Sequence, residues 1–225
     1  MINENTLAEN IRSIKARIEQ AAASCGRNSS AITIVGATKT VPVETIHAAF
    51  LSGINHFGEN YVQEAKSKKD LLAKLEVKPT WHMIGHLQTN KVKNAVELFD
   101  AIETVNSVRL AETIAGKAIK KPMPIMLQVN ITGETGKFGF APKEVVNAYK
   151  TLKALPELSI TGLMTIAPVL ANQEEVRPFF RRLRQLRDSL GLHELSMGMT
   201  GDFEVAIQEG ATIVRIGRAL FGQRR

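Results

Sequence analysis

The chain has 225 residues, of which 44% are hydrophobic and 23% are charged, an ordinary composition for a globular protein. Its single cysteine, Cys25, excludes an intramolecular disulfide and a thiolate metal cluster and favours a reducing compartment. The polar N-terminus does not have the pattern of a signal peptide, and no apolar run is long enough to span a membrane. These features predict a cytoplasmic protein with no membrane partner, and we expect a monomer.

The formal net charge is +7, and a solvated surface with a surplus of lysine is the favoured interpretation of it. A surface that attracts a phosphorylated ligand, an anionic membrane or nucleic acid is the alternative. The few aromatic residues are not interleaved with the basic ones as a base-stacking surface would require, so nucleic acid is disfavoured. Arginines at positions 177, 181, 182, 184 and 187 lie along one amphipathic segment. A solvated helix face is the favoured interpretation of this segment, and a patch for RNA or an acidic partner is the alternative.

The first predicted element is a long N-terminal helix. Thr6 and Glu9 have the spacing of a capping box, and Gly26 ends the segment. Apolar residues recur at helical spacing from Leu7 onward, and Cys25 closes that apolar face. We therefore interpret Cys25 as a packing residue.

Eight units of a strand followed by a helix come next. The predicted strands lie around residue 34 and at 54–58, 81–84, 101–105, 124–130, 159–165, 194–198 and 211–217. Alternating units of this kind predict parallel strands, and eight of them without a linker predict a single α/β domain over residues 1–225, a (β/α)₈ TIM barrel with an extra N-terminal helix. An open doubly wound sheet is the alternative, but it usually has fewer strands, and no G-x-G-x-x-G motif follows the first one.

Two basic residues stand out at the predicted strand ends, which meet at one face of a barrel. Lys39 ends an apolar, β-branched run, and position alone favours a surface lysine over a functional amine. Arg215 interrupts the apolar eighth strand, so an inward orientation would require an ionic partner or a bound ligand. The alternative is that Arg215 points outward among the helices or pairs with a carboxylate such as Glu59.

The segments after the last two strands have the composition of an anion site. Residues 196–202 combine glycines, hydroxyl groups and a predicted helix start, and residues 216–218 offer further backbone N–H groups. A plain capped turn, with Thr200 or Asp202 as the cap, is the alternative. His82 and His86 lie across a strand–loop junction without a metal-binding motif, so we predict no metal site.

Six stretches together resemble the pyridoxal 5′-phosphate homeostasis protein family. They are residues 35–39 (VGATK), 56–64 (HFGENYVQE), 81–91 (WHMIGHLQTNK), 136–139 (GKFG), 162–165 (GLMT) and 196–222, which begins SMGM. The resemblance covers almost the whole chain and implies a barrel similar to the N-terminal domain of alanine racemase.

The resemblance also implies a cofactor site. By this resemblance, Lys39 forms a Schiff base with pyridoxal phosphate, and Arg215 faces the pyridine nitrogen. The phosphate would be held by Ser196, Thr200 and the Gly217 backbone, and the pocket would be lined by Asn60, His82 and Met164.

Two functions follow from the resemblance. The first is a protein of cofactor homeostasis without catalytic turnover, which stores or buffers pyridoxal phosphate or delivers it to apo-enzymes. The second is a racemase-like enzyme, for which the resemblance would place a tyrosine opposite Lys39. Tyr61 and Tyr149 are the two tyrosines of the sequence, and both fall in predicted helices. The first function is therefore favoured.

Overall fold

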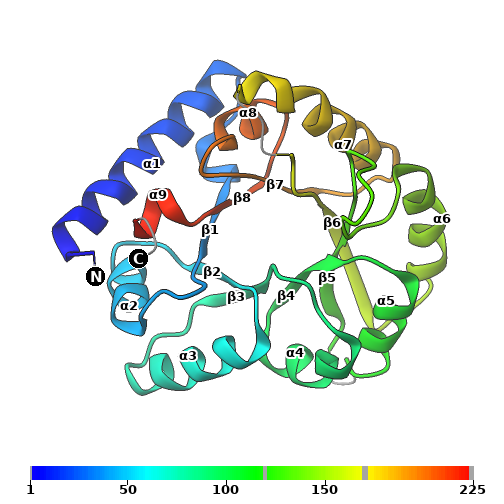
Figure 1. The fold of residues 1–225 in the computed structure, drawn as a ribbon, viewed down its shortest axis with the longest axis horizontal. Helices are drawn as coiled ribbons and strands as arrows, with labels where there is room; N and C mark the ends of the chain where they lie inside the picture. The colour runs from blue at the N-terminus through cyan, green and yellow to red at the C-terminus, as the bar shows by residue number, and fades with distance from the viewer. Residues whose placement is uncertain (1, 119–120, 169–171, 223–225) are drawn as a thin grey trace.

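The computed structural model describes residues 2–118, 121–168 and 172–222. Within these residues, eight parallel strands follow one another in chain order and close into a barrel (Figure 1). The strands are β1 (Thr33–Ala37), β2 (His56–Glu59), β3 (Thr80–Met83), β4 (Ala101–Val105), β5 (Met123–Gln128), β6 (Leu158–Met164), β7 (Glu194–Met199) and β8 (Ile213–Ile216). The predicted (β/α)₈ fold is confirmed, and the open-sheet alternative is wrong because β1 pairs with β8, with Val35 opposite Arg215.

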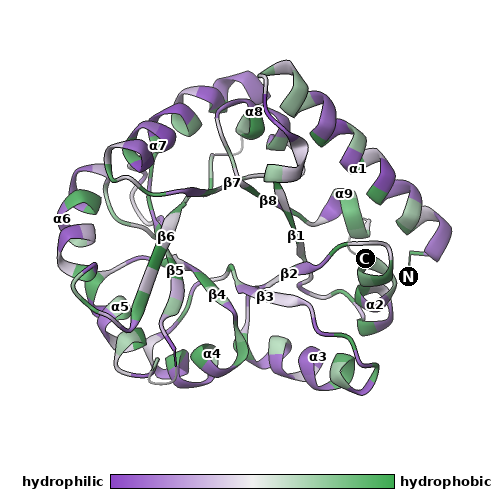
Figure 2. Cartoon of the chain, turned by 180° about the vertical axis from the view of Figure 1, so that it is seen from behind, coloured by the Kyte–Doolittle hydropathy of each residue, from purple (hydrophilic) through white to green (hydrophobic). Residues whose placement is uncertain are grey.

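Helices surround the barrel and cover its outer face (Figure 1). They are α1 (Glu4–Ser24), α2 (Val43–Leu51), α3 (Val62–Lys74), α4 (Val92–Leu98), α5 (Val108–Ala115), α6 (Pro142–Leu152), α7 (Arg177–Ser189), α8 (Phe203–Gln208) and α9 (Arg218–Phe221), with short 3₁₀ turns η1 (Ser29–Ala31), η2 (Thr89–Lys91) and η3 (Gln173–Val176). Figure 2 shows hydrophobic and hydrophilic residues alternating along these helices, as expected for helices with one buried face.

The extra N-terminal helix is present, but its cap and its end differ from the prediction. α1 begins at Glu4, because the Asn3 side chain accepts a hydrogen bond of 2.8 Å from the Thr6 backbone N–H. The predicted capping box at Thr6 is therefore wrong. Cys25 is an exposed free cysteine at the end of α1, and it does not belong to the packed face.

The main hydrophobic core lies between the strands and the helices, where Phe57 and Trp81 are fully buried. A smaller cluster comprises Val35, Met126, Met164 and Ile213. Residues that alternate along a strand point to opposite faces. Polar side chains that point into the barrel therefore lie on the opposite side of the sheet from the main core, and they approach one another there.

Candidate functional site

A cavity of about 300 Å³ opens where the carboxyl ends of the strands meet. It is lined by Ala37, Lys39, Asn60, Ile84, Ile166, Pro168, Gln173, Val176, Met199, Thr200, Gly201, Asp202, Arg215, Gly217 and Arg218. This volume lies at the lower end of the range for small-molecule sites, and this end of the barrel is where (β/α)₈ proteins build their sites.

Lys39 is in the wall of this cavity, two residues beyond the end of β1. The preceding residue, Thr38, is fully buried, whereas Lys39 is partly exposed. The following residue, Thr40, has a φ of 63°, a left-handed conformation that β-branched residues rarely adopt. The backbone thus turns sharply at the lysine.

Arg215 points into the barrel and reaches the cavity while remaining 5% exposed. Its Nη1 donates to Ser196 Oγ (2.5 Å), and its Nη2 donates to the Thr165 carbonyl (2.7 Å). Nη1 lies 3.9 Å from Glu103 Oε2. The alternatives of an outward orientation and of a pair with Glu59 are therefore wrong, because the carboxylate that faces Arg215 is Glu103.

Glu103 continues this contact across the barrel. Its Oε2 accepts a hydrogen bond from Ser196 Oγ (2.5 Å), and its Oε1 lies 2.7 Å from His82 Nδ1. His82 Nε2 in turn lies 3.0 Å from His56 Nδ1, so one ring donates to the other. A continuous polar chain therefore runs from Arg215 through Ser196, Glu103 and His82 to His56.

The electrostatics of this row of hydrogen-bonded side chains favour an ionised Glu103. Full burial alone would raise the pKa of Glu103, but His82, Arg215 and Ser196 together hold that pKa below its ordinary value. Burial lowers the pKa of the Arg215 guanidinium, and the carboxylates of Glu103 and Asp202 oppose that shift. Burial and the neighbouring His82 lower the pKa of His56. The arrangement is a charge pair in the barrel with imidazole groups behind it.

Glu103 was missed at the sequence level, although a signal for it exists. It interrupts the apolar strand β4 as Arg215 interrupts β8, and a charge in a buried strand needs a partner. The argument that singled out Arg215 therefore also predicts that Glu103 is its ionic partner.

The segments after β7 and β8 are tied to each other beside the cavity. Thr200 Oγ1 accepts a hydrogen bond of 3.3 Å from the Ala219 N–H in the first turn of α9. Asp202 Oδ1 accepts one of 2.6 Å from the Met199 N–H, which makes Asp202 a turn-forming residue. Gly217 immediately precedes α9, and the first N–H groups of a helix have no partner within that helix.

Five of the eight predicted site residues come together around the cavity, namely Lys39, Asn60, Thr200, Arg215 and Gly217. The other three, His82, Met164 and Ser196, do not line it and are buried further along their strands. Ser196 holds Arg215 from within the barrel, His82 holds Glu103, and Met164 packs in the small apolar cluster. Strand position alone could not separate the wall of the cavity from the layer of side chains behind it.

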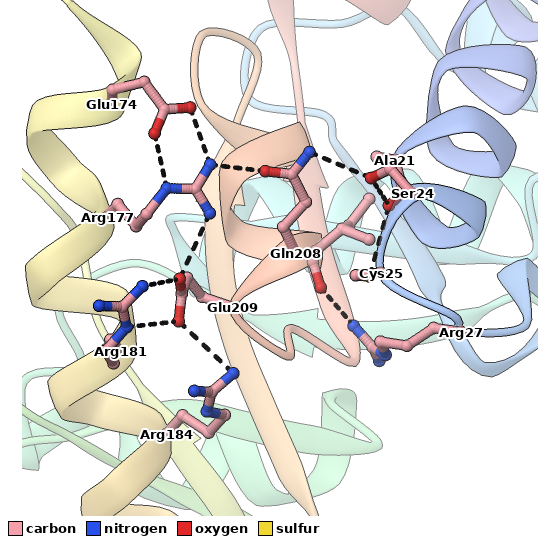
Figure 3. Close-up of polar contacts among 11 residues, drawn as sticks. Ala21, Ser24, Cys25, Arg27, Glu174, Arg177, Arg181, Arg184, Gln208 and Glu209 are labelled. Carbon is pink, nitrogen blue, oxygen red and sulfur yellow. Dashed lines mark hydrogen bonds and ion pairs between the residues drawn. The ribbon is translucent and has the colours of Figure 1, made fainter.

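The arginines of α7 are largely engaged within the molecule (Figure 3). Arg177, Arg181 and Arg184 approach Glu209 at the end of α8 with nitrogen–oxygen distances of 3.3, 2.9 and 3.4 Å. Arg177 also donates to Gln208 Oε1 (2.6 Å) and pairs with Glu174 of η3. Because η3 contributes Gln173 and Val176 to the cavity wall, this network holds that wall against α8.

Two further features of the described residues bear on ligands. Within residues 2–118, 121–168 and 172–222, no cluster of three or more His, Cys, Asp or Glu side chains is placed to hold a metal ion. In the same residues, each helix is too short or too polar to cross a membrane.

Comparison with known proteins identifies the relatives of this chain. Residues 2–225 match the family model for the alanine racemase N-terminal domain. The pyridoxal phosphate homeostasis protein of Aquifex aeolicus is 42% identical, over 96% of this chain and 98% of its own. The protein of that name from Pseudomonas aeruginosa is 41% identical, over 98% and 96% of the two chains. The chain belongs to the pyridoxal phosphate homeostasis protein family.

Solved structures agree with this membership. PipY of Synechococcus elongatus, in a structure with pyridoxal phosphate bound, is 33% identical with a TM-score of 0.84, over 96% of this chain and all of its own. An alanine racemase of Clostridium difficile has a TM-score of 0.74 at 15% identity, and the match covers 98% of this chain and 56% of the racemase chain. The racemase therefore shares the barrel fold with this member of the homeostasis protein family.

Proposed function

We propose that this chain binds pyridoxal 5′-phosphate in the cavity at the carboxyl ends of the strands and serves cofactor homeostasis by storing, buffering or delivering it. The observation that carries the proposal is the convergence of Lys39, Arg215 and the segments after β7 and β8 on one cavity of about 300 Å³. The names of the relatives and the cofactor bound to PipY point to the same ligand.

The residues in the wall fit the three functional parts of this cofactor. The amine of Lys39 would attach covalently to the aldehyde. Thr200, Gly201 and the backbone at Gly217 would receive the phosphate, since hydroxyl and N–H groups at the start of α9 suit an anion. Arg215 and Asn60 would contact the ring, with Ser196, His82 and Met164 supporting them from within the barrel.

Bound pyridoxal phosphate supplies an electron-withdrawing ring to enzymes that use it. Arg215 carries a permanent positive charge, and a cation beside the ring nitrogen disfavours protonation of that nitrogen. A ring whose nitrogen is unprotonated is a weaker electron sink, so removal of a proton from a bound amino acid is less favoured.

The positions of the tyrosines favour a carrier over a racemase-like enzyme. Tyr61 precedes α3 with 65% of its surface exposed and is absent from the cavity wall. Tyr149 lies in α6 and packs against the hydrophobic core. Neither is placed to supply a second base opposite Lys39. The exposed free thiol of Cys25 agrees with residence in the cytoplasm, where apo-enzymes that accept the cofactor would be partners.

The first experiment is an absorbance spectrum of the purified protein with pyridoxal phosphate, before and after borohydride reduction, followed by peptide mapping. We expect a visible band and a reduced adduct on Lys39. Lys39→Ala should abolish the adduct and retain the fold. Absence of a band in the wild type, or an adduct retained in Lys39→Ala, would refute the assignment.

Transfer and turnover distinguish the two functions. A carrier should restore the activity of an apo-enzyme in proportion to the cofactor it has bound. Deuterium from solvent entering Cα of an amino acid at enzymatic rates, and lost in Lys39→Ala, would instead establish a racemase-like activity.

A further inference from the structure

Three side chains on the outer side of the barrel hold the segment that carries Lys39. Glu59 ends β2, and Glu64 and Lys68 lie one turn apart on α3. We call these three residues the α3 clamp. They contact Thr38 and Thr40, the residues on either side of Lys39.

Lys68 is the centre of the clamp, with 7% of its surface exposed. Its Nζ lies 2.6 Å from the Thr38 carbonyl, from Glu59 Oε1 and from Glu64 Oε1. A lysine ammonium has three hydrogens to donate, so these contacts satisfy it fully. The carbonyl that it binds belongs to the residue immediately before Lys39.

Glu59 fixes the same residue through its side chain. Thr38 Oγ1 donates to Glu59 Oε1 (2.7 Å), and the Thr38 N–H donates to the Gly58 carbonyl (2.9 Å). Burial raises the pKa of Glu59, while the hydrogen bonds from Lys68 and Thr38 oppose that shift. Thr38 is thus held at its N–H, its hydroxyl and its carbonyl.

Glu64 fixes the residue after Lys39. The Thr40 N–H donates to Glu64 Oε1 (2.6 Å), and Thr40 is the residue with the left-handed φ of 63°. Backbone strain of this kind persists only where the surroundings enforce it, and it is concentrated at functional sites. Glu64 therefore helps to hold Thr40 in this conformation. The Val41 N–H, which donates to the Thr38 carbonyl (2.8 Å), closes the same turn.

A contribution to the stability of the fold does not by itself explain why the α3 clamp is built from charged residues. Two carboxylates and one ammonium are taken largely out of water, where well-packed apolar residues often stabilise a fold equally well. What the charged cluster adds is a defined geometry for the backbone on both sides of Lys39.

We propose that the α3 clamp positions the neutral Lys39 amine to attack the aldehyde carbon of the cofactor. In this step a C=N bond replaces the aldehyde C=O bond, and the oxygen leaves as water with the two protons of the amine. The inference rests on the proposed function. It assigns Glu59, Glu64 and Lys68 as positioning residues, which act through the backbone of Thr38 and Thr40 and do not contact the ligand. Loss of the clamp should slow attachment at Lys39 without weakening the noncovalent recognition of ring and phosphate.

The test measures two quantities for each variant. The first is the rate at which pyridoxal phosphate forms the borohydride-trapped adduct on Lys39. The second is the Kd for pyridoxine 5′-phosphate, which has the ring and the phosphate but no aldehyde. A defect that is only structural would change both quantities together, whereas a positioning defect would change the first alone.

Lys68→Met keeps an unbranched apolar side chain close to the length of the lysine stem and removes the ammonium. We expect its adduct to form roughly tenfold more slowly, since small displacements of a reacting group cost rate steeply, with the Kd for the alcohol analogue unchanged. Lys66→Met, on the exposed face of the same helix, is the matched control and should behave as the wild type. Equal adduct rates in the two variants would overturn the proposal, as would a parallel loss of analogue affinity in Lys68→Met.

Glu64 gives a second test that does not depend on the folding of Lys68→Met. Glu64→Ala removes the acceptor for the Thr40 N–H and should slow the adduct, whereas Glu64→Gln retains an acceptor oxygen and should recover most of the rate. Thr40→Gly in the Glu64→Ala background should also recover rate, because glycine adopts positive φ without strain. Wild-type rates in Glu64→Ala would overturn the proposal, and failure of the wild type itself to form an adduct would instead count against the proposed function.

Discussion

Glu103 and Arg215 face each other inside the barrel, with 3.9 Å between Oε2 and Nη1 and the Ser196 hydroxyl bonded to both. The two residues belong to β4 and β8, and both are buried. The pair joins the cavity, which Arg215 lines, to the imidazole groups of His82 and His56. Substitutions at either end of the pair should therefore affect both stability and the site.

Glu103→Gln should lower the free energy of unfolding by about 3 kcal/mol, because it leaves the buried Arg215 charge without its carboxylate. Chemical denaturation of the variant and the wild type measures the difference. Glu112→Gln, on an exposed position of α5, is the control and should have little effect. A Glu103→Gln variant as stable as the control would show that the pair contributes no net stability.

Arg215→Lys should weaken the binding of pyridoxal phosphate by roughly tenfold and alter the spectrum of the bound cofactor. Lysine keeps the charge but lacks the planar fork that bridges Ser196 Oγ and the Thr165 carbonyl. Titration with the cofactor, followed by absorbance, measures both effects, with Arg12→Lys on the exposed face of α1 as the control. Unchanged affinity and spectrum would place Arg215 outside the contact with the cofactor.

Gly85→Ala should destabilise the protein by about 2 kcal/mol and weaken binding at the cavity. A Cβ at residue 85 would lie 2.3 Å from the Asn60 carbonyl oxygen and 2.5 Å from Asn60 Cα, so the backbone beside the cavity would have to move. Thermal melts and cofactor titration test this together. Gly116→Ala, where the nearest atom is 3.6 Å away, should be tolerated, and equal behaviour of the two variants would argue against close packing at Asn60.

Glu209→Gln should destabilise the protein by about 1 kcal/mol at neutral pH, because three arginines of α7 lose their shared carboxylate. Burial alone would raise the pKa of Glu209, but Arg181 and Arg177 hold that pKa below its ordinary value. The folded chain therefore binds a proton there less readily than the unfolded chain does. The stabilisation is fully present above the ordinary pKa, about 4.3, and is lost as the pH falls through the lowered folded pKa.

Thermal melts from pH 7 to pH 3 provide the measurement for Glu209. The difference in Tm between the wild type and Glu209→Gln should shrink as the pH falls through this range. Glu19→Gln, on the exposed face of α1, should show no such convergence. A constant difference across the range would mean that the ionisation of Glu209 does not contribute.

Local sequence patterns are enough to predict the barrel and the end of it that carries the site. Apolar runs alternating with helical periodicity require parallel strands with helical crossovers, and eight such units close. Because all carboxyl ends then meet at one face, the positions of Lys39, of Arg215 and of the segments 196–202 and 216–218 place them at that face. These inferences need only local patterns and one rule of topology.

The contacts between particular side chains could not be predicted from these patterns. Ser196 and Glu103 are 93 positions apart in the chain, and Arg177 and Glu209 are 32 apart. Such partners depend on the register of the closed sheet and on how each helix is rotated against it, and neither is encoded in local periodicity. The same reason explains why the sequence did not show that His82, Met164 and Ser196 are buried behind the cavity wall. It also explains why the hydrogen bond from Lys68 to the Thr38 carbonyl could not be predicted.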